Sequence, residues 1–191
     1  KTMPGLKVAA EICEDLWTPN PPSVCHAMHG ATVIVNLSAS DEVTGKDSYR
    51  RDLVKIQSGR LVCGYIYASA GEGESSTDLV FGGHHLIAEN GSVLAESERF
   101  TNETIYGDLD IERLVGERRH YTTYDVIADA DGYIEVEFEM ASADAAFDRY
   151  VDKAPFVPGR KEEREKRCEE ILAIQSMGLK KRMEHTHCKS V

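Results

Sequence analysis

The sequence predicts an α/β fold, in which a β-sheet carries helices on its face. Three short apolar runs, at residues 7–13, 32–37 and 62–69, are bounded by turn-forming residues and are typical of buried strands. Between them lie two segments with helix signals, at residues 24–29 and 45–59. A chain that alternates strands with helices in this way builds a sheet with helices packed against it.

The first apolar run ends in Cys13, which is followed directly by Glu14 and Asp15 and then by Trp17. Cys13 is therefore predicted to lie where a strand ends and the chain turns, the place where an open α/β sheet presents reactive groups. The alternative is that Cys13 is a small buried hydrophobe. The neighbouring acids favour the first interpretation, because charged residues are rarely buried without a partner.

The short helix and the strand after it have recognisable ends. Ser23 is a candidate N-cap for the helix at residues 24–29, and Gly30 ends it. The strand at residues 32–37 is mostly apolar, so we expect it to be buried on both faces.

The longer helix, at residues 45–59, is predicted to be amphipathic. Tyr49, Leu53 and Ile56 share one face of it, and Arg50 is assigned to another. The apolar face is expected to pack against the sheet.

A hairpin is the clearest turn prediction in the chain. Residues 79–88 and 92–97 flank Asn90 and Gly91, a pair that supplies the positive φ angles of a tight hairpin turn. Residues 105–109 are predicted to form the last strand of this layer.

The C-terminal third carries weaker signals. Residues 134–138 alternate apolar and acidic side chains, which predicts a two-sided strand. Pro155 and Pro158 indicate a linker. Residues 162–183 are predicted to form an amphipathic helix, whose apolar side contains Cys168, Ile171, Leu172, Gln175, Leu179 and Met183.

The overall composition limits the classes of partner. A net charge of −11 makes nucleic acid and anionic membrane surfaces unfavourable partners. No apolar run approaches the roughly 18 residues that a membrane span needs. Five cysteines without a Cys-x-x-Cys pair do not suggest a disulfide framework, and the N-terminus does not resemble a signal peptide. We therefore expect a cytoplasmic protein.

Two blocks of sequence identify a family resemblance. Glu-Ile-Cys-Glu-Asp-Leu-Trp at residues 11–17 and Gly-Ala-Thr-Val-Ile-Val-Asn-Leu-Ser-Ala-Ser at residues 30–40 resemble the nitrilase-like glutaminase domain of glutamine-dependent NAD synthetases. The resemblance continues in order through Arg50-Arg51, Gln57-Ser58, residues 65–78, residues 81–84, residues 155–158 and residues 167–172.

The resemblance implies part of a nitrilase-like α-β-β-α sandwich, followed by a linker and a C-terminal helix. Residues 1–125 would form the second half of the glutaminase domain, residues 126–158 a connecting segment, and residues 159–191 the truncated first helix of a synthetase domain. The chain would then be an internal segment of a longer enzyme, and the apolar side of its last helix would dock on that domain.

The resemblance also implies a chemistry. Nitrilase-like amidases use Cys, Glu and Lys, and Cys13 matches the nucleophile that would form a thioester with glutamine and release ammonia. The backbone N–H of Glu14 would help to bind the oxyanion. No residue of this chain matches the family's Glu or Lys, so the chain alone is expected to be inactive.

Substrate-binding residues follow from the same comparison. Glu14 and Ser40 are candidates for binding the α-ammonium group of glutamine, and Lys46 for its α-carboxylate. Many family members carry Arg where this chain has Lys46, and Lys keeps the charge but not the bidentate geometry. Lys46 could instead be a solvated residue at a helix start. Trp17 is either a wall of the pocket or a packing residue.

The remaining implications concern cofactors and partners. The parent enzyme would use ATP and Mg²⁺ in its synthetase domain to amidate nicotinic acid adenine dinucleotide, and no cofactor would bind to this segment. Glutamine, the rest of the same enzyme and further copies in a homo-oligomer are the expected partners. Alternatives are a non-catalytic assembly segment and another nitrilase-type carbon-nitrogen hydrolase. A zinc site is a further alternative, with two groups of candidate ligands: His185, His187 and Cys188, and Cys25, His26 and His29.

Overall fold

The computed structural model describes residues 3–75, 77–124, 132–140, 148–188 and 190. The chain divides into two compact units. Lys1–Arg149 form the N-terminal unit, and Tyr150–Val191 form the C-terminal unit.

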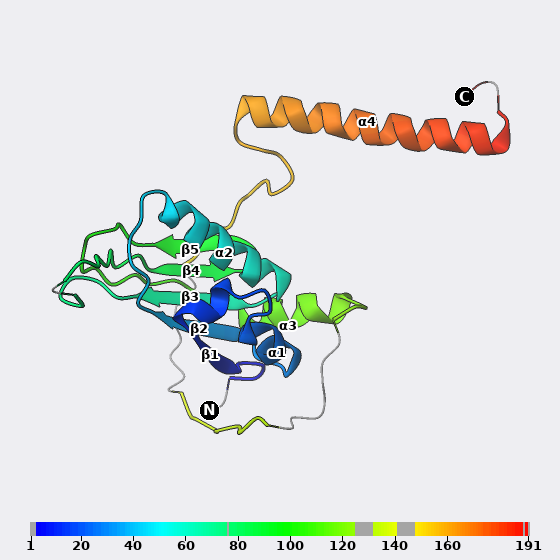
Figure 1. Ribbon diagram of the computed structural model, residues 1–191. Coiled ribbons are helices and arrows are strands. Elements are labelled where there is room, and N and C mark those ends of the chain that lie inside the picture. The colour runs from blue at the N-terminus through cyan, green and yellow to red at the C-terminus, as the bar shows by residue number, and fades with distance from the viewer. Residues whose placement is uncertain (1–2, 76, 125–131, 141–147, 189, 191) are drawn as a thin grey trace. The chain divides into compact units, whose positions relative to one another are not determined.

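The N-terminal unit is built on a five-stranded sheet with the order β1-β2-β3-β4-β5 (Figure 1). The strands are β1 (Val8–Ile12), β2 (Val33–Ser38), β3 (Gly64–Ser69), β4 (Leu86–Glu89) and β5 (Ser92–Glu96). The first three are parallel, and the last two are added in antiparallel orientation. The carboxyl ends of β1, β2 and β3 therefore lie side by side at one edge of the sheet.

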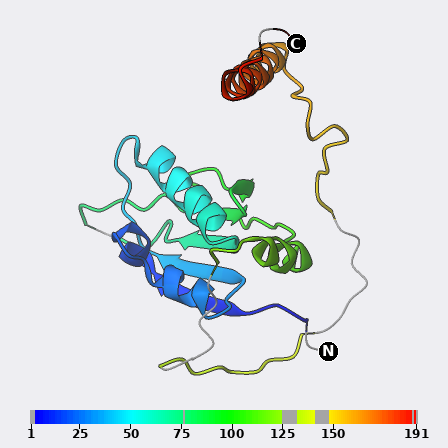
Figure 2. The same cartoon turned by 90° about the vertical axis from the view of Figure 1, so that its right-hand side faces the viewer.

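Helices cover both faces of this sheet (Figure 2). Helices α1 (Pro22–Met28) and α2 (Lys46–Arg60) lie on one face, and α3 (Ile111–His120) lies on the other. The predicted α/β fold is thus confirmed. The main core fills the space beneath α1 and α2, and its buried members are Leu16, Ala27, Ala31, Ile34, Val54, Leu61, Cys63, Tyr65, Tyr67, Leu86 and Ala88.

The opposite face is covered only in part. Helix α3 packs Ile111 and Leu114 against Val33, near the amino end of β2. At the carboxyl end, Ile12 and Leu37 pair in register and are 64% and 61% exposed. The expectation that the strand at residues 32–37 is buried on both faces is therefore wrong at Leu37, because α3 does not extend over that end.

Two side-chain assignments near the helices are also wrong. Ser23 lies inside α1 rather than at its N-cap, and its backbone N–H donates to the buried Glu11 carboxylate at 2.8 Å. In α2 the buried side includes Arg50, which is completely buried, whereas Tyr49 and Ile56 are 55% and 63% exposed. Arg50 faces the core because the buried side chains of Glu42 and His84 bind it there.

The turn of the predicted hairpin is confirmed, but its first strand begins at Leu86 and not at residue 79. Asn90 and Gly91 connect β4 to β5 with φ angles of 44° and 81°, the left-handed region that this turn requires.

Residues 105–109 do not form the predicted strand. They cross the face of the sheet and pack by side chains: Leu109 lies directly on Gly64, where an added Cβ would come within 2.7 Å of Leu109 Cδ1. Helix α3 follows at once and was not predicted. Its N-cap is Asp110, whose carboxylate accepts a hydrogen bond from the backbone N–H of Arg113 at 2.9 Å.

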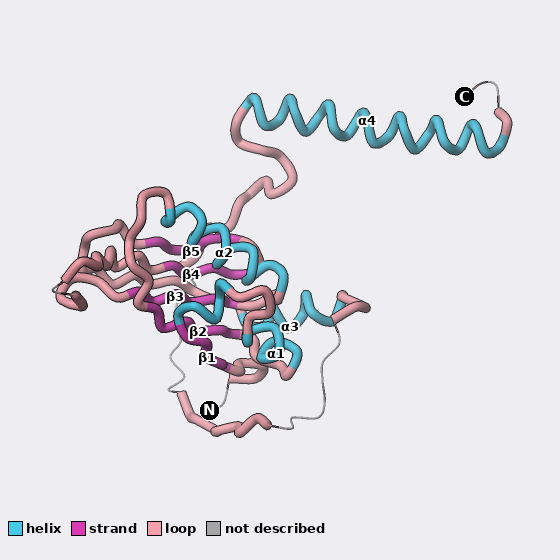
Figure 3. Tube along the Cα trace, in the orientation of Figure 1, coloured by secondary structure: helices cyan, strands magenta, loops and turns pink. Residues whose placement is uncertain are grey.

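Residues 132–140 run as a loop, so the strand predicted at residues 134–138 is wrong (Figure 3). An alternating pattern does not by itself provide a neighbouring strand for hydrogen bonding, and Ile134 and Val136 remain largely exposed.

In the C-terminal unit, the predicted helix is confirmed as α4 (Lys161–Thr186). Its apolar residues Ile171, Leu172 and Leu179 are exposed.

Candidate active site around Cys13

Cys13 lies at the carboxyl edge of the sheet, where β1 ends and the short 3₁₀ helix η1 (Cys13–Trp17) begins. Its φ angle is 50°, in the left-handed region that non-glycine residues rarely adopt. Such a conformation costs about 1–3 kcal/mol and persists only where its surroundings enforce it. The residue is half-buried at this sharp turn.

Asn36, on the adjacent strand β2, holds the main chain of Cys13 from both sides. The Asn36 side-chain oxygen accepts the Cys13 N–H at 3.1 Å, and its amide nitrogen donates to the Cys13 carbonyl at 3.4 Å. Sequence analysis did not single out Asn36, because one polar residue within an apolar strand does not reveal what it faces.

Ser40 is brought to the same edge by the extension of β2. It is 6% exposed, and the hydroxyl of Tyr67 on β3 shares a 2.6 Å hydrogen bond with Ser38. Burial raises the pKa of Tyr67, while hydrogen bonding from Ser38 and Ser40 and the charge of Arg50 oppose the rise.

Lys46 and Trp17 are also brought together, from the first turn of α2 and the end of η1. The Lys46 ammonium lies 5.5 Å from the centre of the Trp17 ring, and the ring centroids of Trp17 and Tyr49 are 5.3 Å apart. Lys46 donates to the Asp41 carbonyl at 2.9 Å and to its carboxylate at 2.8 Å. The hydrogen bond and charge of Lys46 lower the pKa of the Asp41 carboxyl. Lys46 is therefore part-buried and paired, unlike a freely solvated helix start.

Glu14, the second residue of η1, presents an exposed side chain. Its side chain therefore does not join the buried polar groups around Cys13. Its roles in binding the α-ammonium group and the oxyanion stay predictions.

A buried charge network that sequence analysis missed supports the segment between Ser40 and Lys46. Arg50 donates to Glu42 at 2.9 Å and to His84 Nδ1 at 2.9 Å, and His84 Nε2 is 2.8 Å from Glu96. The side chains of Arg50 and Glu42 are 0% and 6% exposed. The Arg50-Arg51 block was a signal for this residue, but helical periodicity placed it on the wrong face.

The other cysteines have different environments. Cys63 is buried in the main core, and burial raises the pKa of its thiol to about 12, which makes it a poor nucleophile. Cys25, Cys168 and Cys188 are exposed on or beside helices. Cys13 is the cysteine that combines a half-buried thiol with a turn at the carboxyl edge of the sheet.

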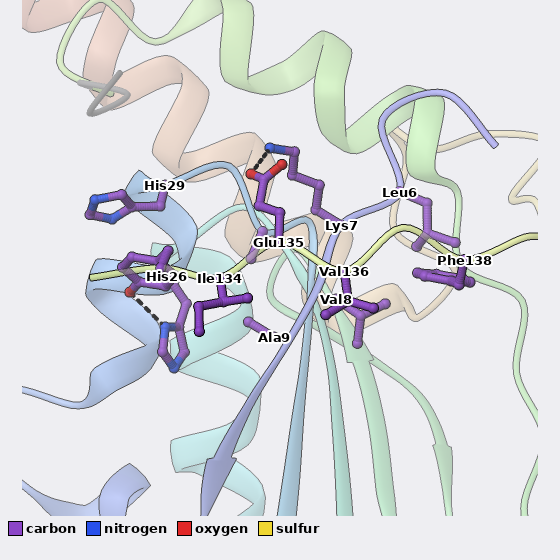
Figure 4. Close-up of a pocket in the computed structure, with 12 residues that line it drawn as sticks. Leu6, Lys7, Val8, Ala9, His26, His29, Ile134, Glu135, Val136 and Phe138 are labelled. Atoms are coloured by element: carbon purple, nitrogen blue, oxygen red, sulfur yellow. Dashed lines mark hydrogen bonds and ion pairs between the residues drawn. The ribbon is translucent and has the colours of Figure 1, made fainter. Parts of the chain in front are cut away.

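The histidines considered as zinc ligands have other neighbours. A cavity of about 390 Å³ lies between β1, α1 and residues 133–138 (Figure 4). Beside it, Tyr133 hydrogen-bonds His26 at 2.8 Å and stacks on His29 at 4.2 Å. Among the residues that the structure describes, no three His, Cys, Asp or Glu side chains are grouped closely enough to hold a metal ion. Within the same residues, no helix has the length and apolar character of a membrane span.

Known proteins include relatives of this chain. The carbon-nitrogen hydrolase family model matches residues 2–119. The chain is 38% identical over 190 residues to the glutamine-dependent NAD(+) synthetase of Mycobacterium bovis, covering 95% of this chain and 28% of that protein. It is 39% identical over 188 residues to the Mycobacterium leprae protein of the same name, covering 94% of this chain and 28% of that protein.

More distant relatives show the same pattern. The human glutamine-dependent NAD(+) synthetase is 32% identical over 139 residues, covering 70% of this chain and 19% of the human protein. A solved nitrilase-superfamily structure from Saccharomyces cerevisiae matches with a TM-score of 0.52 at 20% identity, covering 66% of this chain and 44% of that one. This likeness shows a shared fold.

The chain spans 28% of the length of the mycobacterial relatives that it matches. The family model, by contrast, covers more than half of this chain and includes the whole sheet, η1 and Cys13. The chain therefore belongs to the carbon-nitrogen hydrolase family.

Proposed function

We propose that this chain is part of a glutamine-dependent NAD synthetase and carries the nucleophile of its glutaminase site. The Cys13 sulfur attacks the side-chain amide carbon of glutamine, and the carbon–nitrogen bond breaks as the nitrogen leaves, protonated, as ammonia. Water then hydrolyses the thioester to glutamate and regenerates the thiol. The ammonia is used for the ATP-dependent amidation of nicotinic acid adenine dinucleotide in a second domain.

The observation that carries this proposal is the position of Cys13. It is half-buried in a left-handed turn at the carboxyl ends of parallel strands, and Asn36 holds its main chain. The identity to glutamine-dependent NAD(+) synthetases extends over 95% of the chain, and this supports glutamine as the amide substrate.

The amino-acid head group of glutamine is assigned to the polar residues nearest this turn. Lys46 binds the α-carboxylate, and Ser40 and Glu14 bind the α-ammonium group. Trp17 forms a wall beside Lys46, as its 5.5 Å distance from the ammonium supports. The backbone N–H of Glu14 donates to the oxyanion.

The domain assignment also belongs to this proposal. Residues 1–125 form the second half of the glutaminase domain, residues 126–158 connect it onward, and residues 159–191 begin the synthetase domain. Residues 125–131, 141–147, 189 and 191 lie outside the described residues. ATP, Mg²⁺ and a homo-oligomeric assembly in the cytoplasm belong to the complete enzyme.

Glutamine hydrolysis tests the proposal directly. We expect a complete protein that contains this chain to release glutamate from glutamine in a coupled assay. The 191-residue chain alone should show no turnover above its Cys13→Ala variant, because no residue in it matches the family's Glu and Lys. Turnover by the chain alone would locate a base within these residues. Inactivity of the complete protein would favour the assembly-segment alternative, and turnover of another amide alone would favour a different nitrilase-type hydrolase.

Lys46→Ala is expected to raise KM for glutamine roughly 10- to 150-fold in the complete enzyme, because a hydrogen bond to a charged group contributes about 1.5–3 kcal/mol. Steady-state kinetics with varied glutamine measures the effect. Lys55→Ala is the matched control, since Lys55 is an exposed lysine on the same helix. Lys46→Arg keeps the charge and should restore KM. An unchanged KM in Lys46→Ala would show that Lys46 does not bind the substrate.

A further inference from the structure

Three buried polar residues, joined by hydrogen bonds, connect the interior of the sheet to the turn at Cys13. Glu11, Asn36 and Tyr65 are 2%, 1% and 0% exposed, and they come from β1, β2 and β3 respectively. Of the three, Asn36 contacts Cys13, and none of them takes part in the proposed reaction itself. Buried polar groups are costly unless each of them is hydrogen-bonded.

The first of these three residues is Glu11. Its carboxylate accepts a hydrogen bond at 2.8 Å from the backbone N–H of Ser23, in the first turn of α1. The hydroxyl of Tyr65 donates to the other oxygen of the same carboxylate. Burial raises the pKa of Tyr65, and the negative Glu11 adds to this rise, so Tyr65 keeps its proton for that hydrogen bond.

The single proton of a hydroxyl fixes what Tyr65 can offer to its next neighbour. Because Tyr65 donates to Glu11, its oxygen can only accept from Asn36, whose amide nitrogen lies 3.2 Å away. The amide oxygen of Asn36 must therefore face the Cys13 N–H, at 3.1 Å. If the Asn36 amide were rotated by half a turn, its nitrogen would face the Cys13 N–H, donor against donor. The hydrogen bonds of Asn36 to the Cys13 N–H and to the Tyr65 hydroxyl would then both be lost.

We propose that Asn36 is a positioning residue for Cys13, and that Tyr65 and Glu11 set the orientation of its amide. The strained φ of 50° at Cys13 needs an external restraint, and Asn36 supplies one on each side of the residue. These residues act on the Cys13 backbone and not on the substrate. The proposal rests on the proposed glutaminase function.

Kinetics of the complete enzyme test this role. Tyr65→Phe removes only the hydroxyl, and we expect roughly a 10-fold lower kcat for glutamine-driven synthesis. We expect roughly a 100-fold loss for Asn36→Leu, because small misplacement of a reacting group is costly. KM for glutamine should stay within about twofold, and ammonia-driven synthesis should be unchanged.

The matched control is Tyr124→Phe. It also removes a tyrosine hydroxyl, one that donates to the Leu61 carbonyl at 2.9 Å, before β3 begins and away from the carboxyl edge. Its kcat should remain at the wild-type value. A second readout, the rate of Cys13 alkylation by iodoacetamide followed by peptide mass spectrometry, needs no glutamine and should change in Tyr65→Phe but not in Tyr124→Phe.

Three outcomes would overturn the proposal. They are an unchanged kcat in both Asn36→Leu and Tyr65→Phe, a raised KM with normal kcat, and an equal loss of ammonia-driven synthesis. The first would remove the role, the second would place Asn36 on the substrate, and the third would reduce the role to folding. Failure of the glutaminase proposal itself would look different, because Cys13→Ala would then leave glutamine-driven synthesis intact.

Discussion

Replacing Cys13 by alanine is expected to abolish glutamine-driven NAD synthesis in the complete enzyme and to leave synthesis from added ammonia intact. Without the sulfur no thioester forms, and loss of a nucleophile typically lowers kcat by roughly 10⁴-fold or more. The synthetase chemistry does not use Cys13, so ammonia supplied from solution bypasses the defect. Parallel assays with glutamine and with an ammonium salt measure both activities.

The other cysteines provide the control for this substitution. Cys25 is exposed on α1, and Cys25→Ala should leave both activities unchanged. Retained glutamine-driven turnover in Cys13→Ala would falsify the assignment of the nucleophile. Equal loss of both activities would indicate instead that the turn at Cys13 supports the fold.

The second large effect is expected at Arg50. In Arg50→Met the Glu42 carboxylate loses its buried partner, and breaking one side of a buried ion pair costs about 3–5 kcal/mol. Urea unfolding followed by circular dichroism should show this loss in the free energy of unfolding. Arg99 lies 3.4 Å from the other Glu42 oxygen, but it is part-exposed and cannot fill the space that Arg50 occupies.

Arg51 is the matched control, because it neighbours Arg50 and also pairs with a carboxylate, Glu96, but its side chain is 45% exposed. Exposed ion pairs contribute about 0–1 kcal/mol, so Arg51→Met should have a small effect. The double variant Arg50→Met/Glu42→Leu should recover part of the lost stability, since it leaves no unpaired charge in the core. Equal losses at Arg50 and Arg51 would contradict the assignment of Arg50 as the buried anchor.

The sequence predicted what depends on local pattern. The three strands that alternate with helices, the Asn90-Gly91 turn and the strand end at Cys13 each have signals within a few residues, and the structure confirms them. The resemblance predicts Ser40, Lys46 and Trp17 as substrate-binding residues, and the structure brings Lys46 and Trp17 into contact.

Features that depend on distant partners were not predictable. Arg50 is buried because Glu42 and His84 meet it, and helical periodicity treats every arginine as a surface residue. The orientation of Asn36 depends on a tyrosine in the next strand. Residues 105–109 have the composition of a strand, but Gly64 leaves room for Leu109 on the sheet face, and side-chain packing replaces the ladder.

The uncovered end of the sheet face determines how the Cys13 turn can be shielded from solvent. Ile12, Leu37 and Ala68 form an exposed row in register across three strands, and Cys13 follows Ile12 directly. Any surface that covers this row also brings its own atoms to the edge where the thiol lies. Under the proposed function, covering this apolar row and shielding the Cys13 turn from bulk solvent are therefore one event, since the same contact achieves both.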